Sequence, residues 1–133
     1  MNPQRKAMND AFRMSVVPVL RQMGFQGSLP HFRRCLPDRI DLLTIQFKSS
    51  GGSFVAEIAK CGPNGVIMSW GEEIPPNKVT AQHVSPVQRP RLRPPNAMDD
   101  YWFEFTKKKT PEDAVAELLP LLESIAEPWW NAA

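Results

Sequence analysis

The sequence predicts an α+β fold: an antiparallel sheet of four or five strands with an N-terminal and a C-terminal helix packed on one face. Apolar residues near both ends of the chain recur at spacings of three and four, which is the period of an amphipathic helix. Between the ends, apolar and polar residues alternate in several short runs, as they do in strands. Gly and Pro separate these runs, so successive strands can turn back and pair antiparallel.

Length and composition predict one domain, residues 1–133, because 133 residues suffice to bury roughly two thirds of the surface of the unfolded chain. A net charge of +2, from 16 basic and 14 acidic residues, is too small to indicate nucleic acid or an anionic membrane surface as a partner. No apolar run is long enough for a signal peptide or a membrane span, so we expect a cytoplasmic protein without membrane contact. The two cysteines are expected to stay reduced.

The first element is a helix over about Pro3–Met23, which Gly24 ends. Pro18 lies inside this pattern, lacks an amide hydrogen and is expected to kink the helix. The apolar positions that share one face are Met8, Phe12, Val16, Leu20 and Met23.

Two central runs predict a β-hairpin. Residues alternate with a period of two over Ile40–Lys48 and again over Phe54–Lys60. Gly51 and Gly52 lie between them and tolerate the positive φ angles of a tight turn. Phe32–Leu36, bounded by prolines, is expected to add a short strand before the hairpin.

The second half of the chain is less regular. Val66–Trp70 is expected to form a third or fourth strand, and Tyr101–Thr106 a last strand rich in aromatic residues. Between them, Asn77–Asp99 holds a cluster of four of the chain's 14 prolines, and its pattern does not show whether it is ordered.

The closing helix has a clear start. Thr110 is a suitable N-cap and Pro111 suits the first helical position. Pro120 is expected to bend this helix, and Pro128 to end it just before two Trp residues. Its apolar face is predicted to lie on the sheet and comprises Val115, Leu118, Leu119, Leu122, Ile125 and Ala126.

The sequence offers no credible catalytic centre. Four side chains could in principle ligate zinc, but their spacing matches no common zinc template, and a Cys–His nucleophile pair would need a geometry that sequence does not show. Adjacent acidic residues would point to opposite faces of a strand and could not flank one substrate atom. We therefore expect no catalytic residue, metal site or cofactor. The four potential ligands are His31, Cys35, Cys61 and His83.

The strongest candidate for a binding site is the segment with Arg89, Arg91 and Arg93. In an extended strand the three guanidinium groups would lie on one side, a geometry suited to phosphates or to a carboxylate-rich partner. The alternative is a stiff edge segment whose charges and prolines prevent unwanted strand pairing. Trp70, Trp129 and Trp130 are further candidates, because exposed Trp beside Arg is typical of interfaces, although Trp at the end of an amphipathic helix more often fills the core.

Several short motifs occur in an order that resembles a known family. A helix ends in Gly24-Phe25, a strand reads Ile45-Gln46 with Lys48 after it, and Arg91-Leu92 precedes Asp100 and Trp102. In these features the chain is similar to the bacterial family catalogued as domain of unknown function 4304. It departs from the pattern at Phe103, where the family often carries a second Trp. The resemblance implies a topology, adds Trp102 to the candidate binding residues and transfers no reaction.

These observations favour a non-enzymatic binding module of bacterial origin, of an immunity or regulatory type, that recognises a protein partner. The alternative is a small phosphate- or nucleic-acid-handling domain, or an enzyme, that uses the Arg89–Arg93 segment. Homodimerisation through edge strands is compatible with either.

Overall fold

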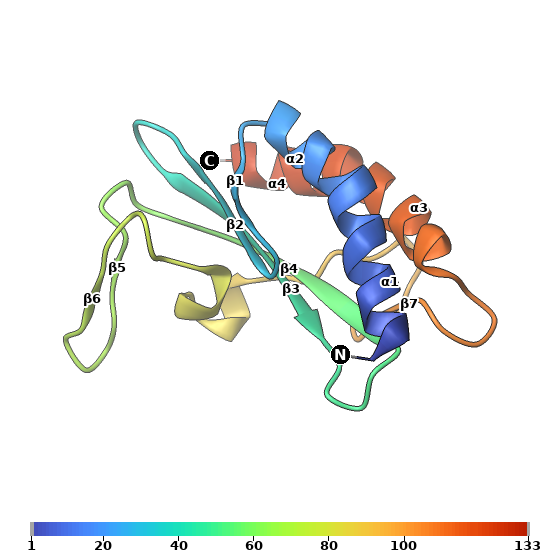
Figure 1. The fold of residues 1–133 in the computed structure, drawn as a ribbon. Helices are drawn as coiled ribbons and strands as arrows, with labels where there is room; N and C mark the ends of the chain where they lie inside the picture. Colours follow the sequence, from blue (N-terminus) through green and yellow to red (C-terminus); the bar gives the residue numbers. More distant parts are fainter. Residues whose placement is uncertain (1, 133) are drawn as a thin grey trace.

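The computed structural model describes residues 2–132 and shows an antiparallel five-stranded sheet covered on one face by two long helices (Figure 1). The predicted α+β fold class is confirmed. The strands lie in the order β1-β2-β3-β4-β7. Their bounds are β1 Gln26–Ser28, β2 His31–Cys35, β3 Ile40–Phe47, β4 Ser53–Cys61 and β7 Phe103–Glu104.

The N-terminal helical segment consists of α1 (Pro3–Ala11), one π-helical turn (Phe12–Val16) and α2 (Val17–Gln22). Asn2 caps it, because its Oδ1 accepts a hydrogen bond from the Gln4 amide at 2.7 Å. In the π-helical turn the Val17 amide donates to the Phe12 carbonyl, five residues back. The wider turn lies directly before Pro18, which has no amide hydrogen to donate, so the helix continues through the proline.

The C-terminal segment uses the same arrangement: α3 (Pro111–Leu121), a π-helical turn (Leu122–Ala126) and α4 (Glu127–Asn131). The predicted start is confirmed, since Thr110 and Asp113 exchange side-chain to backbone hydrogen bonds of a capping box. The prediction that Pro128 ends the helix was wrong. The π-helical turn precedes this proline too, and α4 therefore extends past it to include both Trp residues.

The predicted central hairpin is confirmed, with β3 and β4 paired from Ile40↔Cys61 to Phe47↔Phe54. Its odd-numbered β3 residues, such as Leu43 and Ile45, join the main core beneath the helices. Even-numbered residues face the other way, onto what we call the second face of the sheet. A smaller core lies there, made of Ile40, Leu42, Ala59, Ile74, Val79, Ala81 and Val84.

The strand expected at Val66–Trp70 is shorter and does not belong to the main sheet. Only Val66–Ile67 is extended (β5), and it pairs with β6 (Glu73–Ile74), which was not predicted, in a separate two-stranded ribbon. The chain turns sharply at Gly71, before the expected strand could lengthen. Figure 1 shows this ribbon projecting at the left, away from the helices. We call residues 62–76 the arm.

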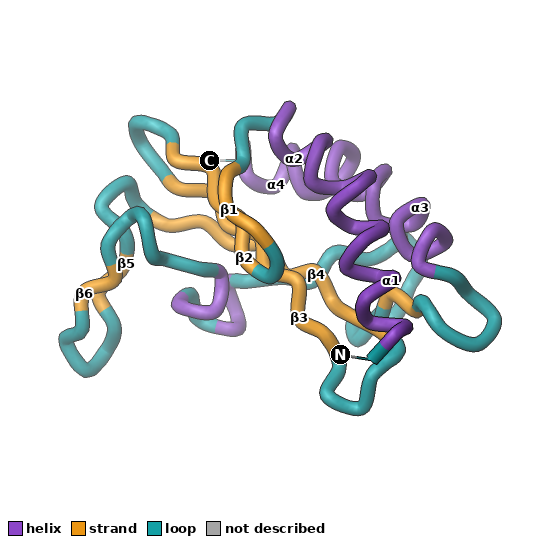
Figure 2. The backbone as a smooth tube through the Cα atoms, viewed as in Figure 1, coloured by secondary structure: helices purple, strands orange, loops and turns teal. Residues whose placement is uncertain are grey.

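The strand expected at Tyr101–Thr106 is reduced to β7, which pairs with β4 only at Ser53 and Phe54. Farther along the same edge of β4, the proline-rich segment takes the place of a strand: the Ile58 amide donates to the Pro90 carbonyl at 3.0 Å. The segment between the arm and this edge is folded, with 3₁₀ turns at Ala81–His83 and Pro86–Gln88 (Figure 2). Two separate segments thus share one edge of β4.

Candidate functional site

The arginine segment lies extended along the edge of β4, and its side chains alternate. Leu92 points into the main core, and the Leu92 amide donates to the Ala56 carbonyl at 2.7 Å. The backbone of Arg91 forms an isolated antiparallel β-bridge with Glu57. Because neighbouring side chains alternate between faces, Arg91 lies on the second face of the sheet, opposite Leu92. Arg89 reaches the same carboxylate, with its Nε 3.2 Å from Oε2 of Glu57.

Glu57 is the residue that organises this cluster, and no pattern in the sequence pointed to it. Its side chain is 6% exposed, and Oε2 lies 3.2 Å from Arg89 and 4.0 Å from Arg91. Its Oε1 is buried without a hydrogen-bond partner among the described residues. A buried carboxylate needs a compensating charge, and the two guanidinium groups supply it. Part of the positive charge predicted for this segment is therefore neutralised within the protein.

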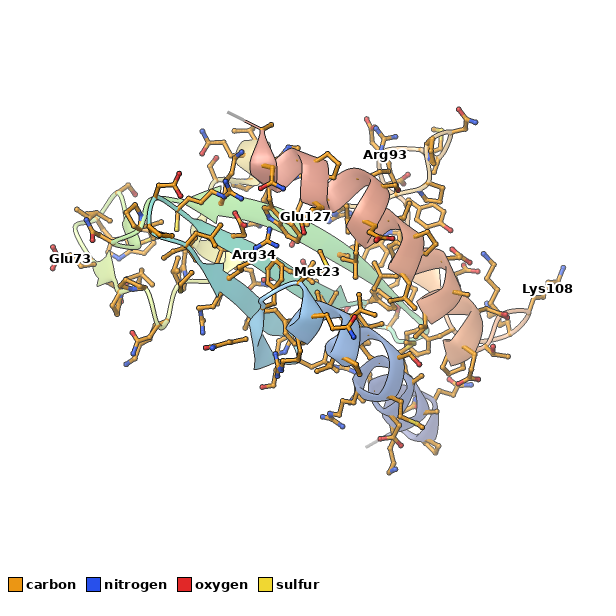
Figure 3. All side chains as sticks on the ribbon, turned by 90° about the horizontal axis from the view of Figure 1, so that it is seen from above. Met23, Arg34, Glu73, Arg93, Lys108 and Glu127 are labelled. Carbon is orange, nitrogen blue, oxygen red and sulfur yellow. The ribbon has the colours of Figure 1, made fainter. Side chains whose placement is uncertain are left out.

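Arg89 and Arg93 also make hydrogen bonds or ion pairs with other residues of the protein. Arg89 Nη1 also donates to the carbonyl oxygens of Gln82 and Val84, at 3.1 and 2.9 Å. Arg93 donates to the Ala97 carbonyl at 2.6 Å and pairs with the exposed Asp99 at 2.9 Å. Figure 3 shows Arg93 at the margin of the molecule. The three residues therefore do not present three free guanidinium groups to one ligand.

Arg91 instead forms a group with Trp102 and Lys48, which we call the platform. The half-buried Trp102 ring lies 5.5 Å from the Arg91 Cζ and 5.5 Å from the Lys48 Nζ. Both are cation–π contacts. Lys48 follows β3 and Trp102 precedes β7, so three segments far apart in sequence meet here. Within residues 2–132 neither cationic head group donates a hydrogen bond, which leaves their donors available to a ligand.

Trp130 and Trp129 have different surroundings. Trp130 is fully buried, packs against Phe25 and donates from Nε1 to the Ala59 carbonyl at 3.0 Å. A partner could reach it only after α4 unpacked from the sheet, so the core alternative describes this residue. Trp129 is half-buried with the Lys60 Nζ 5.0 Å from its ring. Lys60 also donates to carbonyls at the end of α4, including Trp129 at 3.1 Å, and so caps the helix.

An ionic cluster between the sheet and α4 was not predicted. Arg34 donates to Asp41 at 2.9 Å, to both oxygens of Glu127 at 2.6 and 3.0 Å and to the Met23 carbonyl at 3.0 Å. Asp41 is fully buried and also accepts from Arg39 at 2.8 Å. Hydrogen bonding to Arg34 lowers the pKa of Glu127.

This cluster has a structural role. Figure 3 shows Arg34 and Glu127 lying toward each other, with Met23 nearby at the end of the N-terminal helix. All the donor groups of Arg34 are engaged, so it has no donor left for a ligand. The only sign of this cluster in the sequence was an acidic residue, Asp41, at a position of β3 that faces the helices, where apolar residues are expected.

Two of the four potential zinc ligands, His31 and Cys61, have shifted pKa values. His31 Nδ1 lies 2.9 Å from the Thr44 hydroxyl, and burial, together with Arg33 and His83, lowers its pKa. Burial raises the pKa of Cys61 to about 11, so its thiol stays protonated. Among residues 2–132, no three His, Cys, Asp or Glu side chains gather as metal ligands would. No helix in that range is long and apolar enough to cross a membrane.

The family's sequence profile, described as Domain of unknown function (DUF4304), matches residues 16–132. The chain belongs to this family. No curated protein and no solved structure matches it. Among the residues that carry the resemblance to DUF4304, Lys48, Arg91 and Trp102 are the three that form the platform.

Proposed function

We propose that this DUF4304 chain is a non-enzymatic binding module of the bacterial cytoplasm, of an immunity or regulatory type, which recognises a protein through the platform. The observation that supports this proposal is that the Trp102 ring lies 5.5 Å from each of two cationic head groups, Lys48 and Arg91, which donate no hydrogen bond to another described residue. Trp and Arg are the residue types most enriched at the energetic centres of protein interfaces. The matching partner surface presents carboxylates beside an apolar or aromatic side chain.

The rigidity of the platform also supports recognition. Arg91 lies on backbone that is hydrogen-bonded to β4 on both sides, through Pro90 and Leu92. Trp102 directly precedes β7, and Lys48 is tied to the turn by its amide, which donates to the Ser53 carbonyl at 2.9 Å. Backbone that is held in place before binding loses less conformational entropy in the complex.

The phosphate or nucleic-acid alternative has weaker support. A strand of nucleic acid needs several free cations along its backbone. Here Glu57 and two carbonyls engage Arg89, and Asp99 and a carbonyl engage Arg93. The platform is thus limited to one aromatic ring and two cations, of which Lys48 has no ion-pair partner among the described residues and Arg91 shares the Glu57 carboxylate at 4.0 Å. This small number of charges suits a short acidic epitope of a protein.

The experiment is affinity purification of the tagged protein from its native cytoplasm after nuclease treatment, followed by titration of the recovered partner in purified form. We expect Trp102→Ala and Arg91→Glu each to weaken binding at least tenfold. The matched control is Lys108→Glu, which changes the same charge on an exposed loop after β7. Thermal unfolding confirms that each variant is folded.

Two results would overturn the proposal. A partner that binds all four proteins equally well does not use the platform. Retained material that disappears with nuclease, and whose binding weakens steeply as salt rises, would assign the platform to nucleic acid.

A further inference from the structure

The arm is a fixed hairpin. Val66 pairs with Ile74 and Ile67 with Glu73, and the Met68 amide donates to the Glu72 carbonyl at 2.8 Å. Ile74 is buried in the smaller core, with Val66 and Met68 packed against it. The arm is therefore anchored to the second face of the sheet through one of its sides.

The other side of the arm is apolar and acidic. Ile67 is 72% exposed and Trp70 is 70% exposed, although the protein has only five large hydrophobic side chains this exposed among the described residues. Glu72 and Glu73 lie beside them, and Trp70 Nε1 donates to the Glu72 carboxylate at 3.2 Å. Residues 62–76 contain no Lys or Arg, so the arm has a charge of −2. Exposed apolar side chains gathered on a protruding element indicate an interaction surface.

The arm has the chemistry that the platform requires: an exposed Trp and Ile beside two carboxylates. The platform offers a half-buried Trp102 and two cations, so the two surfaces are complementary in charge as well as in aromatic character. The arm cannot serve its own platform. Its packing against the smaller core holds it at one end of the molecule, and β7 lies at the other end (Figure 1). Trp102 directly precedes β7, whereas Glu73 of the arm lies at the far left in Figure 3.

We propose that the arm of one copy docks on the platform of a second copy, and that a two-fold dimer is formed by the reciprocal exchange. In a closed two-fold dimer both arms and both platforms are used, so neither apolar surface stays exposed. Trp70 would pack beside Trp102, while Glu72 and Glu73 pair with Lys48 and Arg91. This inference rests on the platform of the proposed function and names a second copy of the chain as one of its partners.

Charge exchange tests the dimer. Sedimentation equilibrium of the wild-type protein over a range of concentrations should show a monomer–dimer equilibrium. One variant reverses the arm, Glu72→Lys with Glu73→Lys, and the other reverses the platform, Lys48→Glu with Arg91→Glu. Each should weaken self-association at least tenfold, because arm and platform then have the same sign. An equimolar mixture should recover the dimer, because both arm–platform contacts in the mixed pair again join opposite charges.

The matched control for exposed apolar surface is Met14→Ser, since Met14 is 79% exposed on the N-terminal helical segment. It should leave the equilibrium unchanged, whereas Trp70→Ser should weaken it. A wild-type protein that stays monomeric at every concentration would refute the inference. A dimer that survives either reversal, or a mixture that stays monomeric, would refute it as well.

The same variants separate this inference from the proposed function. Binding of a foreign partner should persist or strengthen when only the arm is reversed, because the platform is then intact and unoccupied. If the wild-type is monomeric but partner binding depends on Trp102, the dimer is refuted and the proposed function stands. If the dimer forms as described and no foreign partner depends on Trp102, the platform serves self-association alone.

Discussion

Replacing Arg34 by Met should lower the free energy of unfolding by about 3 kcal/mol. The side chain of similar length keeps most of the packing but removes the hydrogen bonds to Asp41, Glu127 and the Met23 carbonyl. Removing one partner of a buried ion pair typically costs about 3–5 kcal/mol, because the other charge is left uncompensated. The lower end applies here, since Asp41 keeps Arg39 and the Glu127 side chain is 29% exposed and can be hydrated.

For a domain of this size, about 3 kcal/mol corresponds to a fall in Tm of about 10 °C. Urea unfolding followed by circular dichroism measures the free energy, and an unchanged m-value shows that the unfolded state is not altered. Arg13→Met is the control, because Arg13 is 62% exposed and its nearest carboxylate oxygen, on Asp10, is 3.9 Å away. It should cost less than about 0.5 kcal/mol. If the two variants differed by less than about 1 kcal/mol, the cluster would not hold α4 on the sheet.

Two further predictions concern α4. Because Arg34 lowers the pKa of Glu127 in the folded state, the unfolded chain takes up the proton first as pH falls, and this contribution to stability is lost below about pH 4.5. Glu127→Gln should therefore be less stable than wild-type at neutral pH and lose less stability on acidification; parallel Tm–pH profiles would contradict this. Trp130→Phe keeps a buried aromatic ring but loses the hydrogen bond from Nε1 to the Ala59 carbonyl, and should cost about 0.5–1.5 kcal/mol in urea unfolding. A cost below about 0.5 kcal/mol would show that this hydrogen bond is dispensable.

Local periodicity was sufficient to predict the main elements. The alternation over Ile40–Lys48 and Phe54–Lys60 fixes which residues face the helices, and the turn between them fixes the pairing of the hairpin. The start at Thr110 was equally readable, because a capping box is local chemistry. The end of the last helix could not be predicted in this way, because Pro128 ends a helix only if the turn before it stays α-helical, and here that turn is π-helical.

Features that depend on competition between distant segments could not be read from the sequence. The aromatic run at Tyr101–Thr106 has good strand propensity, yet only two of its residues pair, because the segment around Arg91 occupies the remaining edge of β4. The same limit applies to the candidate site. Alternation predicted that the arginines would share one side, but nothing local showed that Glu57 would neutralise part of their charge.

The division of charge between the two sheet faces supports the platform as the proposed recognition site. On the helix side, Arg34 is saturated by Asp41, Glu127 and a backbone carbonyl, and Lys60 caps α4. These groups hold the helices in place and would have to break existing contacts to bind anything else. At the platform, neither the Lys48 nor the Arg91 head group donates a hydrogen bond to another described residue, and the only ion pair there joins Arg91 to Glu57 at 4.0 Å. A ligand there gains hydrogen bonds without the loss of internal ones. Substitutions that change binding without lowering stability should therefore lie on the second face.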